Sequence, residues 1–229
     1  MARFLTALAA LTLAAAPAAA DERRAMVTAF DRVRVEGPFA VDISTGASPA
    51  AIATGASRAL DGVEMRVEDR TLIVRGSVND AGGWPGERLQ RPTIRVTTLS
   101  LGGVTVMGAG RVRIDTMRSA DVAIRLTGSG QIEVADIQAD RLEASVVGSG
   151  ALRLSGTALT ANMLNNGVGT IEAAGLSVRD LTLQSESGGD SRAHATRTAN
   201  ATALGMGGIT ITGPAACTRA GPGTISCGK

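Results

Sequence analysis

The chain has 229 residues, a formal net charge of +2 and 2% aromatic residues, with no tyrosine. This near-neutral balance, without a basic stripe, argues against nucleic-acid binding. The scarcity of aromatic rings argues mildly against a dedicated lectin, because sugar-binding surfaces often stack aromatic faces on pyranose rings. The length is sufficient for one sizeable domain.

The first twenty residues have the features of a secretory signal peptide. Arg3 gives a positive start, residues 4–16 are apolar, and Ala18-Ala19-Ala20 offers a small-residue cleavage site. We therefore expect residues 1–20 to be a signal peptide and residues 21–229 to form a single exported domain, located in the periplasm or outside the cell. No later stretch reaches the roughly 18 apolar residues of a membrane helix, so no transmembrane segment is expected.

Residues 28–75 are predicted to form the N-terminal coils of the domain. Val33 and Val35 alternate with arginines, Gly37-Pro38 marks a turn, and apolar residues alternate again from Phe39 to Ile43. This period of two is typical of strands that have one buried side.

A second strand-like stretch follows. Residues 50–60 predict at most one weak helical turn, whereas residues 63–67 and 71–74 predict strands on either side of a turn. Residues 76–92 are rich in glycine and proline and predict a surface loop. This loop holds the only tryptophan, Trp84. Its ring could face a ligand or cover apolar edges of the core, and the second interpretation is favoured.

Residues 93–227 carry a repeated Gly-x-Gly motif, and each copy is followed by a short alternating apolar run. Such self-similarity near 20 residues predicts coils that stack strand over strand, because one coil cannot bury its apolar side alone. We therefore predict an all-β, parallel β-solenoid with coils of about 16–22 residues rather than a β-sandwich of hairpins, which would favour Asn-Gly or Asp-Gly turns. The second glycine of each motif, or the residue aligned with it, is Gly110, Gly130, Gly150, Gly169, Ser191, Gly207 and Gly223.

The alignment also predicts which side chains point inward and which point outward. Residues two and four places after each aligned corner are apolar and should face the core. Residues three places after it should form one outward column with alternating charge. We interpret this column as a solvated ladder that fixes register, in preference to a charged groove. The inward set is Val112, Ile114, Ile132, Val134, Leu152, Leu154, Ile171, Ala173, Ala193, Ala195, Ile209 and Ile211, and the outward column is Arg113, Glu133, Arg153, Glu172, His194 and Thr210.

The two cysteines, Cys217 and Cys227, lie near the end of the sequence on either side of the turn Gly221-Pro222-Gly223. In an exported chain the oxidised state is expected, so we predict a disulfide that closes the last turn. A metal site is the alternative, but no further cysteine or histidine lies nearby in the sequence.

The order of these features resembles the head-GIN-domain putative autotransporter adhesin family. The resemblance rests on the pattern from Phe30 to Ile43, on Leu72-Ile73-Val74 and on the run of Gly-Ser-Gly corners, and it covers residues 28–227. It implies a single-stranded, right-handed parallel β-helix. It implies no catalytic or ligand-binding residue, because none is established for the family.

Few residues suggest chemistry. The only histidine, His194, has no predicted nucleophile or carboxylate partner, and Gly188-Gly189-Asp190 is similar to one copy of a calcium-binding repeat that needs several. Asp136 and Asp140, beside Arg141, form the best acidic cluster, but acid–base catalysis needs a tighter group. We predict no catalytic residue, no cofactor and no metal.

Three functions are compatible with this sequence. The favoured one is a non-enzymatic envelope protein that acts in adhesion or surface interaction with a protein or a glycan. The second is a structural module that associates end to end through unpaired terminal strands. The third and least favoured is a polysaccharide-active β-helix enzyme, because fold alone does not establish catalysis.

Overall fold

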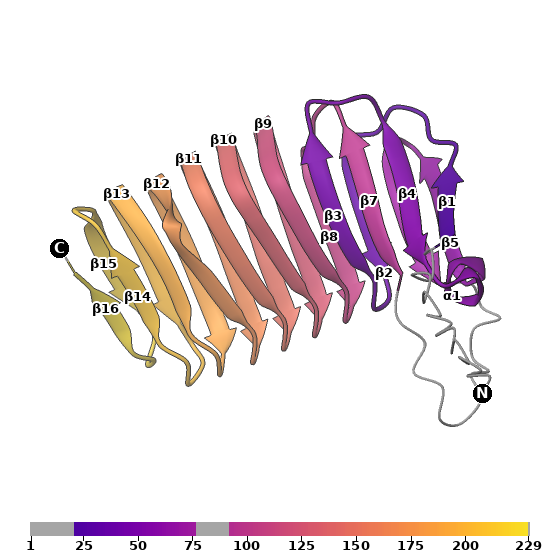
Figure 1. The fold of residues 1–229 in the computed structure, drawn as a ribbon. Coiled ribbons are helices and arrows are strands. Elements are labelled where there is room, and N and C mark those ends of the chain that lie inside the picture. Colours follow the sequence, from indigo (N-terminus) through magenta and orange to yellow (C-terminus); the bar gives the residue numbers. More distant parts are fainter. Residues whose placement is uncertain (1–20, 77–91, 229) are drawn as a thin grey trace, which may run out of the picture.

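The computed structural model describes residues 21–76 and 92–228, and these residues form a long stack of strands (Figure 1). The predicted signal peptide, Trp84 and Lys229 lie outside the described residues. Five long strands follow one another in parallel register, which confirms the predicted parallel β-solenoid. They are β9 (Arg111–Gly128), β10 (Gln131–Gly148), β11 (Ala151–Gly167), β12 (Thr170–Ser187) and β13 (Ser191–Ala203).

Each of these strands bends so that its first half lies on one side of the coil and its second half on the other. The corner between successive coils requires glycine. Gly128 and Gly148 have φ values of 114° and 116°, which side chains of L-residues rarely adopt. A Cβ atom on Gly128 would also lie 2.6 Å from the carbonyl oxygen of Gly108 in the previous coil. The recurring glycines therefore allow both the turn and the close stacking of one corner on the next.

The predicted inward residues line a common core. Ile132 pairs with Val112 on one side and with Leu152 on the other, and all three side chains are buried. Every other member of the predicted inward set is also buried. The alternation of apolar and polar residues therefore predicted these core residues correctly.

The predicted alignment of the fifth repeat is wrong. Ile171 pairs with Ser191 and Ala173 pairs with Ala193, so Gly189, and not Ser191, is the residue stacked on Gly169. A Cβ atom on Gly189 would lie 2.2 Å from the carbonyl oxygen of Gly169, which explains why glycine is needed there. The error equals two residues, so it left the inward residues inward and changed only their partners in the neighbouring coil.

The N-terminal strands do not simply precede the repeats. On one side of the solenoid β2 (Arg32–Glu36) lies between β6 (Thr71–Gly76) and β8 (Gly103–Gly108), and on the other side β3 (Ala40–Thr45) lies between β7 (Thr93–Thr98) and β9. All of these pairs are parallel. The first coil in the sequence is therefore interleaved between coils formed by residues that come much later.

Antiparallel elements close the N-terminal end. β1 (Asp21–Ala25) pairs with β4 (Ala50–Gly55), and β5 (Val63–Glu68) pairs with β6. The β5–β6 turn contains Asp69 and Arg70, whose φ values of 46° and 60° match the positive φ values of a type I′ hairpin. The expected single helical turn is α1 (Ser57–Asp61).

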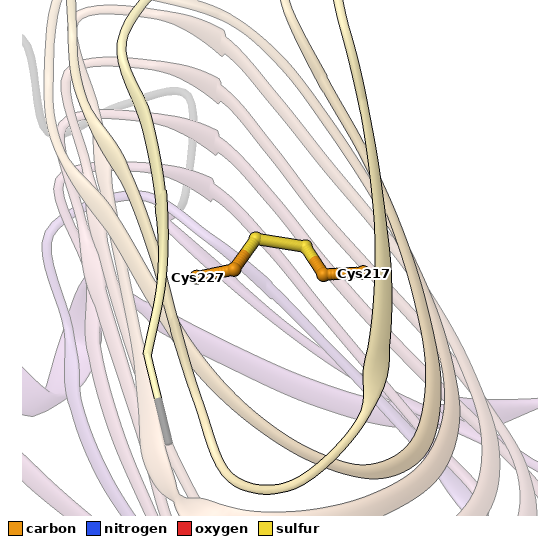
Figure 2. The surroundings of a disulfide bond; sticks show 2 residues. All are labelled: Cys217 and Cys227. Atoms are coloured by element: carbon orange, nitrogen blue, oxygen red, sulfur yellow. A yellow bond between two sulfur atoms is a disulfide. The ribbon is translucent and has the colours of Figure 1, made fainter.

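Short strands and the two cysteines form the other end. β14 (Ile209–Thr212) pairs with β13 and β16 (Ile225–Cys227), while β15 (Ala216–Ala220) pairs with β13. The sulfur atoms of Cys217 and Cys227 lie at a bonded distance of 1.95 Å. Figure 2 shows that this bond crosses from one side of the last coil to the other. It therefore covers the end of the core.

Candidate functional site

One outward column lies on the side of the solenoid that the first halves of the long strands form, and its charge alternates over seven strands. Only two of its ion pairs fall within 4 Å in the described ranges: Arg113 Nε lies 3.5 Å from Glu133 Oε2, and Arg192 Nη1 lies 3.1 Å from Glu172 Oε2. These pairs are exposed, so they contribute little individually and mainly disfavour slipped registers. In order along the stack the column is Arg95, Asp42, Arg113, Glu133, Arg153, Glu172 and Arg192.

This column corrects the predicted place of His194. Because the fifth repeat aligns on Gly189, Arg192 occupies the position that the sequence alignment gave to His194. His194 pairs with Thr212 of β14 instead, and its Nδ1 lies 3.0 Å from Thr212 Oγ1. Among the residues that the structure describes, no carboxylate bonds to this imidazole, so it has no partner for acid–base catalysis.

The other side of the solenoid, which the second halves of the long strands form, presents a surface of a different kind. We call this surface the amide face. Its first column runs through four neighbouring strands and consists of exposed amide and hydroxyl side chains, one from each strand. Within residues 21–76 and 92–228 none of these four side chains makes a hydrogen bond. Their hydrogen-bonding capacity is thus available to a ligand. The column is Asn162, Thr182, Asn200 and Thr218, and the adjacent column on the same strands is Leu164, Gln184, Thr202 and Ala220.

A shallow hollow of about 350 Å³ lies at one end of the amide face. Asn162, Leu164, Thr182 and Gln184 line it from the amide face, and Arg125 and Glu143 line it from the neighbouring coils. The Arg125 Nη2 and Glu143 Oε2 atoms are 3.2 Å apart, so these two charges pair with each other. The hollow therefore offers polar groups, one exposed aliphatic side chain and a compensated pair of charges.

The residues at one edge of the amide face form a fixed ionic corner. Asp180 accepts hydrogen bonds from Arg197 Nε at 2.7 Å, from Thr198 Oγ1 at 2.7 Å and from Arg179 Nε at 3.1 Å. The hydrogen bonds from Arg197, then Thr198, hold the pKa of the Asp180 carboxyl well below its usual range. This corner stays ionised and compensated, which is the behaviour of a structural network.

A similar arrangement occurs near the N-terminal end. The hydrogen bond from Arg75, with further attraction from Arg66, lowers the pKa of Glu64. Arg75 Nε lies 2.8 Å from Glu64 Oε2, and Arg66 Nη1 lies 2.9 Å from Glu64 Oε1. Burial is slight, so the lowered pKa marks an ordinary surface pair and not a catalytic acid.

The predicted acidic cluster does not come together as a site. Asp136 accepts a hydrogen bond from Gln138 Nε2 at 2.8 Å, whereas Arg141 donates to Asp121 in the previous coil at 2.7 Å and not to Asp140. Asp136 stands in a local irregularity, because β11 has one residue fewer than β10 between the paired positions Val134 and Ile137. The two carboxylates thus belong to separate surroundings.

The single copy similar to a calcium-binding repeat has a local structural role. Asp190 Oδ1 accepts a hydrogen bond from the backbone amide of Gly208 at 3.0 Å, and its other oxygen lies 3.7 Å from Arg192. In the described part of the chain no three histidine, cysteine, aspartate or glutamate residues are grouped so as to hold a metal ion.

Solved structures show the same fold. A crystal structure of a putative adhesin from Bacteroides fragilis is 22% identical, with a TM-score of 0.83, and the match covers 91% of this chain and 96% of that one. A putative lipid binding protein from Parabacteroides distasonis is 21% identical, with a TM-score of 0.69 over 93% and 97% of the two chains. A putative adhesin from Parabacteroides merdae is 19% identical, with a TM-score of 0.69 over 93% and 96%.

At these identities the structural likeness establishes the fold alone. No curated protein matches the sequence. In the described ranges no helix is long and apolar enough to cross a membrane. The model of the family described as "Putative auto-transporter adhesin, head GIN domain" matches residues 29–215, which is most of the chain. This match over most of the chain shows that it belongs to the head GIN domain family of putative auto-transporter adhesins.

Proposed function

We propose that this chain is an exported, non-enzymatic β-solenoid of the cell envelope that acts as an adhesin-like surface-interaction module. The family description supports contact with a surface as its role. The signal-peptide pattern of residues 1–20 supports export.

The observation that carries this proposal is the amide face. Within the described residues, the side chains of Asn162, Thr182, Asn200 and Thr218 present free donors and acceptors on the surface of a continuous parallel sheet. By contrast, Asp136 and Asp140 do not form one cluster, and Asp121 and Asp180 are paired with arginines, which does not favour acid–base catalysis. A preorganised surface with unused hydrogen bonds suits binding better than catalysis.

The test is to locate a tagged copy in the host cell and to identify what it retains. We expect the protein in the periplasmic, surface or medium fraction, with a mature N-terminus at Asp21 that mass spectrometry of the purified protein would detect. Pull-down from that fraction should recover envelope components. A cytoplasmic protein with an intact Met1 would contradict the proposal.

A second candidate function is end-to-end self-association. In the described coils β15 pairs only with β13, and β16 pairs only with β14, so each has one unpaired edge. Unpaired edges are templates for further strands. By contrast, the N-terminal edge strand β1 carries four charged residues, Asp21 to Arg24, which disfavour such pairing. Concentration-dependent oligomers in size-exclusion chromatography would support this function, and a monomer at high concentration would exclude it.

The polysaccharide-active enzyme remains the least favoured function. The same purified protein, incubated with cell-wall and plant polysaccharides, should release no product. Product release that Asp136→Ala or Asp140→Ala abolishes would overturn the non-enzymatic proposal.

A further inference from the structure

The amide face differs from the charged column on the other side of the solenoid in the kind of side chain that it presents. The nearby charged residues Arg125 and Glu143, and Arg141 and Asp121, pair with each other. Within the described ranges the side chains of one amide-face column, which are all uncharged and polar, make no hydrogen bonds. In the adjacent columns the Gln184 and Asn166 amides both donate to Glu186, at 2.9 and 3.2 Å.

The chemistry of the free amide and hydroxyl side chains indicates the class of ligand that could bind them. Amide and hydroxyl side chains both donate and accept hydrogen bonds without carrying charge, which suits the hydroxyl groups of sugars. No lysine or arginine stands in either column of the amide face, and Glu186 at its margin adds negative charge. An anionic polymer, which is held by basic groups, would find none in these two columns, and the nearby Arg125 and Arg197 are already paired with Glu143 and Asp180.

The regular spacing of the amide and hydroxyl side chains favours an extended polymer as the ligand. Successive strands lie about 4.8 Å apart, so Asn162, Thr182, Asn200 and Thr218 repeat at that interval along the solenoid axis. A chain of sugar units laid along the axis presents its own hydroxyls at a comparable interval. The exposed Leu164 side chain, beside the hollow, offers an apolar surface for the C–H face of one sugar.

We propose, on the basis of the proposed function, that the amide face binds a neutral polysaccharide whose chain runs along the solenoid axis. Without aromatic rings to stack on the sugars, each unit is held weakly, and useful affinity comes from several units bound at once. A short oligosaccharide should therefore bind much more weakly than the polymer from which it is cut. This reconciles the scarcity of aromatic residues with recognition of a glycan.

The experiment is co-sedimentation of the purified mature chain with insoluble cellulose, xylan and chitin, and electrophoresis of the chain in gels containing anionic polygalacturonate. The test variant carries Asn162→Ala, Thr182→Ala and Asn200→Ala, which remove three exposed free groups without touching the core. The matched control carries Gln131→Ala, Thr170→Ala and Thr210→Ala on the other side of the solenoid. Circular dichroism melting curves establish that both variants remain folded.

We expect the wild-type chain to sediment with at least one of the neutral polymers and to migrate normally in polygalacturonate. The test variant should show a rise of roughly tenfold or more in apparent Kd, because three hydrogen bonds are removed, whereas the control variant should bind as the wild type does. Binding to none of the neutral polymers would overturn the inference. So would equal binding by the test variant and the wild type, or retardation by polygalacturonate alone. These outcomes leave the proposed envelope role intact, because the location and pull-down experiment tests that role separately.

Discussion

The coils at the two ends of the repeat region follow the same path but are filled differently. In β9 the inward residues Ile124 and Leu126 are large aliphatic side chains, whereas the residues at the end of the same columns in β13 are Ala201 and Ala203. One column changes step by step along the stack, from Leu126 through Val146, Asn165 and Ser185 to Ala203. The path of the chain is therefore the same whether the core side chains are large or small, and we expect the coils with larger buried side chains to be held more strongly.

The later coils, where small and polar side chains enter the core, are also held by buried hydrogen bonds and by the disulfide. Asn165 Nδ2 donates to the Gly169 carbonyl at 2.9 Å and to Ser191 Oγ at 3.0 Å, and Ser187 Oγ donates to the same carbonyl at 3.0 Å. All of these side chains are fully buried. The Cys217–Cys227 bond then covers the last coil. Buried hydrogen bonds and a covalent bond thus replace part of the apolar packing.

The largest expected effect comes from shortening a large core side chain of the first repeat coil. Leu126→Ala should lower the free energy of unfolding by about 2–5 kcal/mol, because it removes buried methyl groups and leaves a cavity. The change at the other end of the same column, Ala203→Gly in β13, should cost only about 1 kcal/mol. Urea denaturation followed by circular dichroism measures both. Equal losses would contradict the view that large side chains contribute most to the cohesion of the first coils.

Removal of the disulfide should have the next largest effect, and a local one. The double variant Cys217→Ser and Cys227→Ser should lose about 2–3 kcal/mol of stability, since the unfolded chain is no longer constrained. Because each coil contacts mainly its neighbours, hydrogen exchange should accelerate first in β14, β15 and β16. Faster exchange throughout β9 and β10 as well would mean that the stack behaves as one cooperative unit.

Substitution of two buried serines should change the free energy of unfolding by smaller amounts, with opposite signs for the two residues. Ser185 Oγ is buried and has no hydrogen-bond partner, so Ser185→Ala should raise the free energy of unfolding by about 1 kcal/mol. Ser187 Oγ donates to the Gly169 carbonyl and accepts from the Gly189 amide, so Ser187→Ala should lower it by about 1 kcal/mol. Thermal melting of both variants checks this difference. The same sign for both would contradict the assignment of Ser185 as unpartnered.

The smallest expected effect concerns the charged column. Glu133→Gln should reduce stability by about 0.2–1 kcal/mol at low ionic strength, because it removes the cross-strand attraction between Glu133 and Arg113. The difference from the wild type should shrink in 1 M salt, where exposed charges are screened. Denaturation curves at the two salt concentrations measure it. A loss that persists unchanged in high salt would point to packing instead of charge.

Most of the fold could be predicted from the sequence because its causes are local. The corner at Gly128, with its positive φ, corresponds to the glycine spacing, and the burial of Ile132 follows from the alternation of apolar residues. The alternating charges of Arg113 and Glu133 were predicted from the same alignment. The fifth repeat was misaligned because Gly189 was taken as the first residue of its motif, with Ser191 in the place of the second glycine. Gly189 is itself the second corner residue, and only its contact with Gly169 in the preceding coil reveals this.

Other features depend on distant pairing and were not predicted. Nothing in the sequence near β2 and β3 indicates that they lie between strands formed by residues 71–128. The amide face was missed because only the column after each corner was aligned. Its members Asn162, Thr182, Asn200 and Thr218 are 20, 18 and 18 residues apart, so aligning the second halves of the coils would have found it.

The interleaved first coil has a consequence for the order in which the coils can fold. Val41 pairs with Val112, across roughly seventy intervening positions, whereas each later coil joins its predecessor across about twenty. In a chain synthesised from its N-terminus, this segment therefore lacks its β9 partner until β9 has been made. Residues 32–45 would stay incompletely paired for longest, whereas each later coil could close on its predecessor as soon as it appears.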